Sequence, residues 1–197
     1  SATNLVEHLR ILGQRVALLP LESKEDGDSR RRAIARLLAG LLDDKLRQSL
    51  ERAFRLLKID YPSEDIHGVQ VASLSRDARA RANAGEFLDA LLTRHDQQRV
   101  RELFRLVCDD LMPAERVGRA AKYLPRRPPR GRQEALVALM EDSDLAVSAL
   151  AGLYAESIGG RSLDSAIEKA RRRRPEIGVT ARRLFADRVA VDEAAGG

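Results

Sequence analysis

The feature that most constrains this chain is a pattern of apolar residues that occurs four times at nearly constant intervals. In residues 78–92 the apolar side chains step by +4, +3, +1 and +3, which places all of them on one stripe of a helix with about 3.6 residues per turn. The four copies are Leu46, Leu50, Ala53, Phe54 and Leu57; Ala80, Ala84, Phe87, Leu88 and Leu91; Pro113, Val117, Ala120, Ala121 and Leu124; and Val147, Ala151, Tyr154, Ala155 and Ile158. The first members are residues 46, 80, 113 and 147, so the intervals are 34, 33 and 34 residues. A fixed period of this length is typical of repeat proteins.

Each period contains a second amphipathic helix. Its apolar positions are Ile34, Leu37, Leu38 and Leu41 in one copy, Val100, Leu103, Phe104 and Val107 two periods later, and, in a degraded form, Gln133, Leu136, Val137 and Met140. We expect helices over 4–19, 30–42, 44–58, 65–74, 78–92, 97–107, from 113 onward, over 136–158 with a turn inside, over 162–174 and over 177–190. The sequence therefore predicts a chain of helical hairpins.

Acidic and hydroxyl side chains stand where these helices are expected to begin. The pairs Asp43-Asp44 and Asp109-Asp110 and the single Asp77 fall at the repeated turn, where an aspartate caps a helix N-terminus. Ser63 is expected to cap the helix that Ile66 opens, and Ser29 the helix after the polar loop 22–29. The segment 123–132 contains three prolines and four arginines, so we expect it to be a loop.

Composition favours packed helices over a sheet. Hydrophobic residues make up 44% of the chain, but aromatic residues only 4%, with no Trp, and the apolar positions are mostly Leu, Ala and Val. A sheet favours β-branched and aromatic residues instead. There is no run of about 18 apolar residues that would predict a membrane span.

The turn at Glu141–Val147, with its two aspartates between apolar helices, resembles the turn of HEAT and HEAT-like repeats. The Thr-Pro-Leu-His turn of ankyrin repeats and the Trp, Leu-Gly and Tyr positions of tetratricopeptide repeats are missing. The resemblance implies an all-α fold, a right-handed α-solenoid of about five HEAT-like helical hairpins. We expect one domain over residues 1–197, with an N-terminal capping helix and loop (1–28), four regular repeats (29–158) and a C-terminal capping repeat (159–197).

Residues 54–92 carry a narrower resemblance. The sequence Phe-Arg-Leu-Leu-Lys-Ile-Asp-Tyr-Pro-Ser-Glu-Asp-Ile leads into Ala-Asn-Ala-Gly-Glu-Phe-Leu-Asp-Ala-Leu-Leu, and it resembles the HEAT-like region that follows the membrane part of bacterial relatives of the ATP/ADP translocases, which are major-facilitator-like transporters. The resemblance implies a cytoplasmic domain tethered to a membrane carrier, at the cytoplasmic face of the inner membrane. No nucleotide-carrier residue can be transferred to this chain. Because the chain starts at Ser1 rather than Met, we expect it to be part of a larger protein.

No pattern in the sequence predicts catalysis, a cofactor or a metal. His8, His67 and His95 have no partner at metal-ligand spacing and are expected on the surface or at helix caps. Cys108 is the only cysteine, so no intramolecular disulfide can form, and we expect it to be a small buried residue. Gly159 and Gly160 are read as a helix C-cap rather than as a phosphate loop.

Two basic clusters are the candidate binding residues: Arg126, Arg127, Arg130 and Arg132 in the proline loop, and Arg171, Arg172, Arg173 and Arg174 before Pro175. The chain has a formal net charge of +5. Of its 35 Lys and Arg residues, five are lysines and 30 are arginines. Three interpretations remain open: a solvated face with ion pairs, a surface for anionic lipid or an acidic partner, and a surface for nucleic-acid phosphates.

The function we expect is that of a non-catalytic interaction or regulatory module that binds a protein partner, as the cytoplasmic domain of a transporter. The alternative is a free soluble HEAT-like protein that binds nucleic acid through the arginine clusters, with an architecture like that of the HEAT-like DNA glycosylases. Neither cluster contains an interleaved aromatic residue, so the stacking contacts of such enzymes would be missing.

Overall fold

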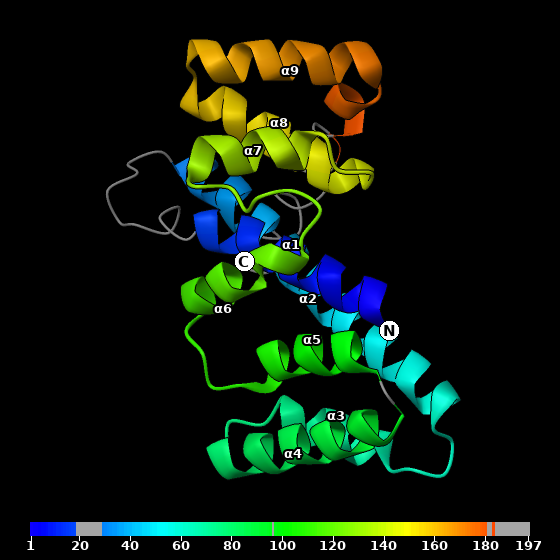
Figure 1. Ribbon diagram of the computed structural model, residues 1–197. Coiled ribbons are helices and arrows are strands. Elements are labelled where there is room, and N and C mark those ends of the chain that lie inside the picture. Colours follow the sequence, from blue (N-terminus) through cyan, green and yellow to red (C-terminus); the bar gives the residue numbers. More distant parts are fainter. Residues whose placement is uncertain (19–28, 96, 181–182, 184–197) are drawn as a thin grey trace, which may run out of the picture. The chain divides into compact units, whose positions relative to one another are not determined.

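The structure is a computed structural model that describes residues 1–18, 29–95, 97–180 and 183 (Figure 1). The regular elements in these ranges are all helical, which confirms the prediction of an all-α fold. They are α1 (Ala2–Leu18), α2 (Ser29–Asp60), α3 (Ile66–Ser73), α4 (Ala78–Arg94), α5 (Gln98–Cys108), α6 (Pro113–Ala120), the 3-10 turn η2 (Ala121–Tyr123), α7 (Arg132–Met140), α8 (Leu145–Ile158) and α9 (Arg161–Arg173). Most of the expected loop 22–29, residue 96 and all but the first residues of the expected helix 177–190 lie outside the described residues.

The chain divides into two compact units that share α2. The first combines Ser1–Val16 with Asp44–Pro128, and the second combines Ala17–Asp43 with Pro129–Gly197. Helix α2 passes from the second unit into the first between Asp43 and Asp44. Residues distant in sequence therefore contribute to each unit.

The prediction of two helices over 30–42 and 44–58 is wrong, because α2 is a single helix of 32 residues. Asp43 and Asp44 lie inside it, and the Asp44 carboxylate accepts a hydrogen bond from Arg47 Nη2 at 2.8 Å, one turn further along. The local sequence Leu-Leu-Asp-Asp-Lys-Leu contains neither proline nor glycine. Since nothing in it stops a helix, the helix continues through the expected turn.

In the first unit, helices adjacent in sequence pack on each other: α3 on α4, α4 on α5, and α5 on α6. The aromatic centre of this core is a tilted pair of rings, Phe54 from α2 and Phe104 from α5, with centroids 5.1 Å apart. Around it the buried core residues are Leu5, Leu9, Leu50, Ala53, Leu57, Tyr61, Ile66, Leu88, Leu91, Leu92, Leu103, Cys108 and Ala120. Most members of the stripes predicted for α2 and α4 meet in this core. The stripe predicted from Pro113 to Leu124 is only partly right, because α6 ends at Ala120 and both Pro113 and Ala121 are exposed.

The helix starts of this unit are only partly as expected. Asp77 caps α4, as predicted, by accepting a hydrogen bond from the Arg79 backbone N–H at 2.8 Å. Helix α3 is capped by Asp65 rather than Ser63, and the bond from the Gly68 N–H is 3.0 Å long. The Asp65 carboxylate lies close to Gly68, so a Cβ at position 68 would require the Asp65 side chain to shift.

The prediction that Asp109 and Asp110 cap a helix is also wrong. Asp109 follows the end of α5, and Met112 precedes α6 without a capping side-chain bond. Pro113 occupies the first turn of α6, as predicted, where its missing N–H costs nothing. Asp110 precedes Met112 by two positions, and its carboxylate pairs with Arg81 of α4 instead, at 2.7 Å.

In the second unit, α8 packs against α7 and α9, and α7 also packs against α9 (Figure 1). Buried residues cover most of α8, from Val147 through Ala155 with a single half-buried exception, Leu153. The N-terminal part of α2 adds a further neighbour, since the Arg31 guanidinium donates a hydrogen bond to the Ser157 carbonyl, 126 positions away. A stack in which hairpins contact only their neighbours in sequence does not bring these two residues together.

Candidate functional site

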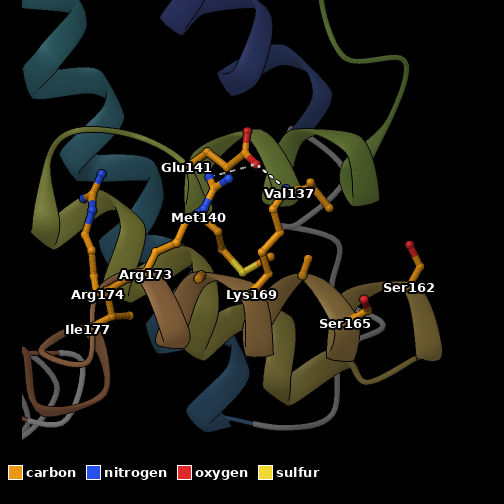
Figure 2. Close-up of a pocket in the computed structure, with 11 residues that line it drawn as sticks. Val137, Met140, Glu141, Ser162, Ser165, Lys169, Arg173, Arg174 and Ile177 are labelled. Carbon is orange, nitrogen blue, oxygen red and sulfur yellow. Dashed lines mark hydrogen bonds and ion pairs between the residues drawn. The ribbon is translucent and has the colours of Figure 1, made fainter.

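A groove between α7 and α9 is the candidate binding site, and all of its lining residues belong to the second unit (Figure 2). Its volume is about 270 Å³. The floor is apolar and is formed by Val137, Met140, Ala166, Ala170 and Ile177. Met140 and Ile177 are only 3% and 5% exposed, so the floor is part of the core of this unit.

The rim of the groove is polar, and its chemistry changes along its length. Ser162 and Ser165 lie at one end, near the start of α9, whereas Arg173 and Arg174 lie at the other (Figure 2). Basic residues at a helix C-terminus interact favourably with the partial negative charge of the helix dipole. The groove therefore has a hydroxyl end and a cationic end.

The sequence of α9 explains how it presents both floor and rim. Leu163, Ile167 and Ala170 follow the +4, +3 spacing and are buried, while the basic residues of the last turn fall on the other positions. Gly159 and Gly160 make the sharp change of direction before this helix, with φ angles of 73° and 120°. Such angles favour glycine, and the predicted C-cap at Gly159 is confirmed.

Glu141 connects the two walls of the groove. It follows the last residue of α7, and its carboxylate lies 3.1 Å from Lys169 Nζ and 3.8 Å from Arg173 Nη1, both on α9 (Figure 2). Arg174 Nη1 donates a hydrogen bond to the Ser143 carbonyl at 3.4 Å. The turn after α7 is thus held against the C-terminal end of α9 by three basic side chains.

The second predicted arginine cluster, Arg171 to Arg174, does not form one uniform patch. Arg173 and Arg174 line the groove, whereas Arg171 lines a separate hollow of about 620 Å³ that α8 and Arg30 also border. Arg171 pairs with Glu156 of α8, and Arg172 pairs with Glu168 one turn back on α9. Part of the positive charge in this cluster is therefore balanced by neighbouring carboxylates.

Three residues of the first predicted cluster, Arg126, Arg127 and Arg130, lie in the non-helical segment between η2 and α7, as expected, whereas Arg132 is the first residue of α7. Arg126, Arg127 and Arg130 are exposed, and Arg132 is half-buried at the start of α7. The unit boundary falls inside this segment: Arg126 and Arg127 belong to the first unit, Arg130 and Arg132 to the second. None of these four residues lines the groove between α7 and α9.

Of the eleven residues that line the groove, only Arg173 and Arg174 are predicted site residues; the other nine, among them Met140, Glu141 and Lys169, are not. Met140 was assigned only to the inward face of its helix, which the structure confirms. Glu141 and Lys169 are 28 positions apart, and nothing in the sequence pairs them. The only signal in the sequence is that each of these charged residues stands next to an apolar residue of a helix, Met140 and Ala170.

His8 is buried, so the prediction of a surface or cap histidine is wrong for this residue. Its Nδ1–H donates a hydrogen bond to the Leu46 carbonyl at 2.9 Å, and the Ser49 hydroxyl lies 3.3 Å away. Burial lowers the pKa of His8 below its ordinary value, the bond to Leu46 opposes this, and the charge of Arg116 adds to the lowering. His67 and His95 are exposed, as predicted.

A second groove lies between α4 and α5 in the first unit, with a volume of about 410 Å³. Its charged side chains serve structural contacts: Arg81 donates hydrogen bonds to the Ser75 and Arg76 carbonyls and pairs with Asp110. Cys108 lies at its base and is buried, as predicted, and burial raises the pKa of the thiol. The thiol is therefore held in its unreactive protonated form at neutral pH.

Within the described ranges, no three His, Cys, Asp or Glu side chains come close enough together to hold a metal ion. In the same ranges, the helices are too short or too polar to cross a membrane. Comparisons with protein-family models, with curated proteins and with solved structures found no match to this chain. The groove between α7 and α9 is accordingly interpreted from its own chemistry.

Proposed function

We propose that this protein is a non-catalytic HEAT-like interaction module whose groove between α7 and α9 holds a segment of a protein partner. The observation that carries the proposal is an apolar floor bordered by charged side chains on two adjacent helices. Protein interfaces commonly combine a buried apolar centre with a polar rim. The volume of about 270 Å³ suits one or two side chains of a peptide better than a cofactor.

For the architecture, we propose a right-handed α-solenoid of about five HEAT-like hairpins. Its support is the period of 33 or 34 residues and the packing of adjacent helices from α3 to α6 and from α7 to α9. Residues 29–43 belong to the same unit as α8, and Arg31 donates a hydrogen bond to the Ser157 carbonyl, so the solenoid would include a contact between distant repeats. Each hairpin would contribute one ridge to an extended surface.

A random peptide library displayed against the full chain tests the interaction function. Ser165 lines the groove and is exposed, so Ser165→Trp fills the groove from its rim without disturbing the core. Glu168→Trp is the control, because Glu168 is exposed on α9 but does not line the groove. We expect peptides selected by the unaltered protein to keep binding the Glu168→Trp variant and to lose the Ser165→Trp variant. The proposed function fails if no peptide is selected, or if both variants bind equally.

We further propose that the module is the cytoplasmic domain of a transporter related to the ATP/ADP carriers. The support is the resemblance of residues 54–92, which span the end of α2, helix α3 and most of α4. Sequencing the gene upstream of the Ser1 codon tests this: about ten or more apolar segments of roughly 20 residues are expected there. A start codon close to Ser1 would contradict it.

Nucleic-acid binding is the second candidate function, favoured by the two arginine clusters. Against it stand the carboxylate partners of Arg171, Arg172 and Arg173 and the lack of any aromatic side chain in the groove lining. If it holds, a short DNA duplex should bind with an affinity that falls steeply with salt. Absence of binding even at low salt would remove this candidate.

A further inference from the structure

The cationic end of the groove carries more positive than negative charge. Basic residues fill five of the six positions from 169 to 174: Lys169, Arg171, Arg172, Arg173 and Arg174. Arg171 and Arg172 lie outside the groove lining and pair with Glu156 and Glu168. Among the described residues, the groove lining therefore contains three cations, Lys169, Arg173 and Arg174, and one carboxylate, Glu141. This excess favours an anionic group on the ligand.

Glu141 occupies the place that such a group would take. One carboxylate is shared between Lys169 and Arg173, and its distance to Arg173 is long, at 3.8 Å. All three side chains are partly exposed, with 34% for Glu141 and about 60% for the two cations. Exposed ion pairs contribute little net stability, so a ligand carboxylate can replace Glu141 at small cost.

The floor indicates what should accompany the carboxylate. Val137, Met140 and Ala166 offer an apolar surface beside the two cations. We propose that the groove binds an acidic amphipathic peptide segment, with an apolar side chain on this floor and a carboxylate that displaces Glu141 from Lys169 and Arg173. The inference rests on the proposed function and names the chemistry of the partner at the same site.

Two other anionic ligands fit the groove less well. A nucleic acid would lack aromatic side chains on which to stack its bases, because the lining contains none. A membrane surface requires a protruding basic face, whereas these cations border a hollow that contains a carboxylate of its own. An apolar side chain next to an acidic one meets both the floor and the rim.

The test uses the full chain and a fluorescent synthetic peptide of Leu and Glu, about four helical turns long, with anisotropy as the readout. Lys169→Gln combined with Arg173→Gln should weaken binding about tenfold or more, which corresponds to the loss of two charge-assisted contacts. The matched control is Arg161→Gln with Arg172→Gln, which removes the same charge from exposed positions of α9 outside the groove lining. The control should bind within about twofold of the unaltered protein, since remote exposed charges contribute little.

Glu141→Gln is the decisive variant, because it should strengthen peptide binding where the double variant weakens it. It releases Lys169 and Arg173 for the ligand, so binding of the Leu-Glu peptide should tighten several-fold, whereas Glu168→Gln, outside the groove, should not change it. Replacing Glu by Gln in the peptide should abolish the gain. The helical circular dichroism signal of each variant identifies any loss of folding. If the double variant is unfolded, the single change Lys169→Met tests the contact between Lys169 and the ligand carboxylate.

Several results would overturn the inference. Equal weakening by the groove variant and its charge-matched control would mean that binding is a general charge effect. Weaker or unchanged binding by Glu141→Gln would mean that Glu141 does not compete with the ligand. A third contrary result would be that the peptide does not bind, whereas a DNA duplex or phosphatidylserine vesicles bind the unaltered protein and not the groove variant. The site would then belong to that other ligand. If the displayed library selects only neutral or basic peptides, the interaction function stands and the acidic partner does not.

Discussion

Asp43 and Asp77 stand one period apart in the sequence, but they have different structural roles. Asp77 ends the turn after α3 and caps α4 through the Arg79 backbone N–H. Asp43 lies inside α2, which continues without a turn to Asp60. The difference teaches that a capping residue permits a helix to begin but does not force the preceding helix to end.

The residues around each aspartate decide which outcome occurs. Asp77 follows Leu-Ser-Arg, and the Ser75 hydroxyl accepts a hydrogen bond from the Asp77 N–H at 3.1 Å, which stabilises the turn. Asp43 follows Gly-Leu-Leu and precedes Asp-Lys-Leu, all of which a helix tolerates. Two residues at the same position of the repeat therefore need not have the same structure. Pairs of substitutions one period apart measure this difference as a difference in the free energy of unfolding.

The largest effect is expected at Ala155, which is fully buried in α8. Ala155→Asp should lower the free energy of unfolding by about 3–5 kcal/mol, because it places an unpaired charge in the core. The matched change, Ala121→Asp, lies 34 positions earlier at an exposed site and should cost no more than about 0.5 kcal/mol. Urea denaturation of both variants checks this, and similar midpoints would contradict the burial assigned to α8.

Proline substitution tests the continuity of α2 directly. Asp44→Pro should cost about 3 kcal/mol or more, because it removes a helical hydrogen bond and clashes with the preceding turn. Ala78→Pro, one period later, should cost less than about 1 kcal/mol, since it falls on the first residue of α4 after an extended Asp77 with ψ of 115°. The measurement is helical circular dichroism during denaturation. If Asp44→Pro is tolerated, the two-helix interpretation of residues 30–58 is right after all.

Two aspartates at the same repeat position, Asp77 and Asp110, should differ by a smaller amount. Asp77→Ala removes a helix cap and should cost about 1 kcal/mol. Asp110→Ala removes only an ion pair with Arg81 in which the Asp110 side chain is 84% exposed, so its cost should stay below about 0.5 kcal/mol. Both residues belong to the first unit, so thermal unfolding of that unit reports both changes. A larger loss for Asp110 would mean that Arg81 depends on it to hold the turn at Ser75.

The N-terminal helix has no copy one period away, and its contact with α2 is tested by pH. Above the ordinary pKa of 6.5, His8 is neutral in both states and adds no pH dependence. Below it, the unfolded chain binds the proton more readily than the folded chain, whose His8 pKa is lowered, so stability falls as the pH falls. We expect His8→Gln to reduce this fall between pH 7 and 5, and an unchanged slope would contradict the burial of His8.

The candidate site was predictable only in part. The basic run before Pro175 and the inward face containing Met140 were both legible in the sequence. The sequence did not predict that they meet in one groove, because this depends on the packing of α7 against α9. The division of the arginines between the groove, the hollow beside α8 and solvent depends on the angular position of each residue on α9, combined with where Glu141 and Glu156 lie.

The sequence alone determined the helical fold, most helix boundaries and most buried positions, because the apolar spacing within a helix is a local property. It also determined the sharp turn at Gly159-Gly160, since these φ angles favour glycine. Tertiary structure alone decided that α2 contributes residues to two units, that Arg31 near its start contacts Ser157 of α8, and that His8 is buried. These outcomes depend on contacts between residues far apart in the chain, such as Arg31 with Ser157, and no local pattern specifies such contacts.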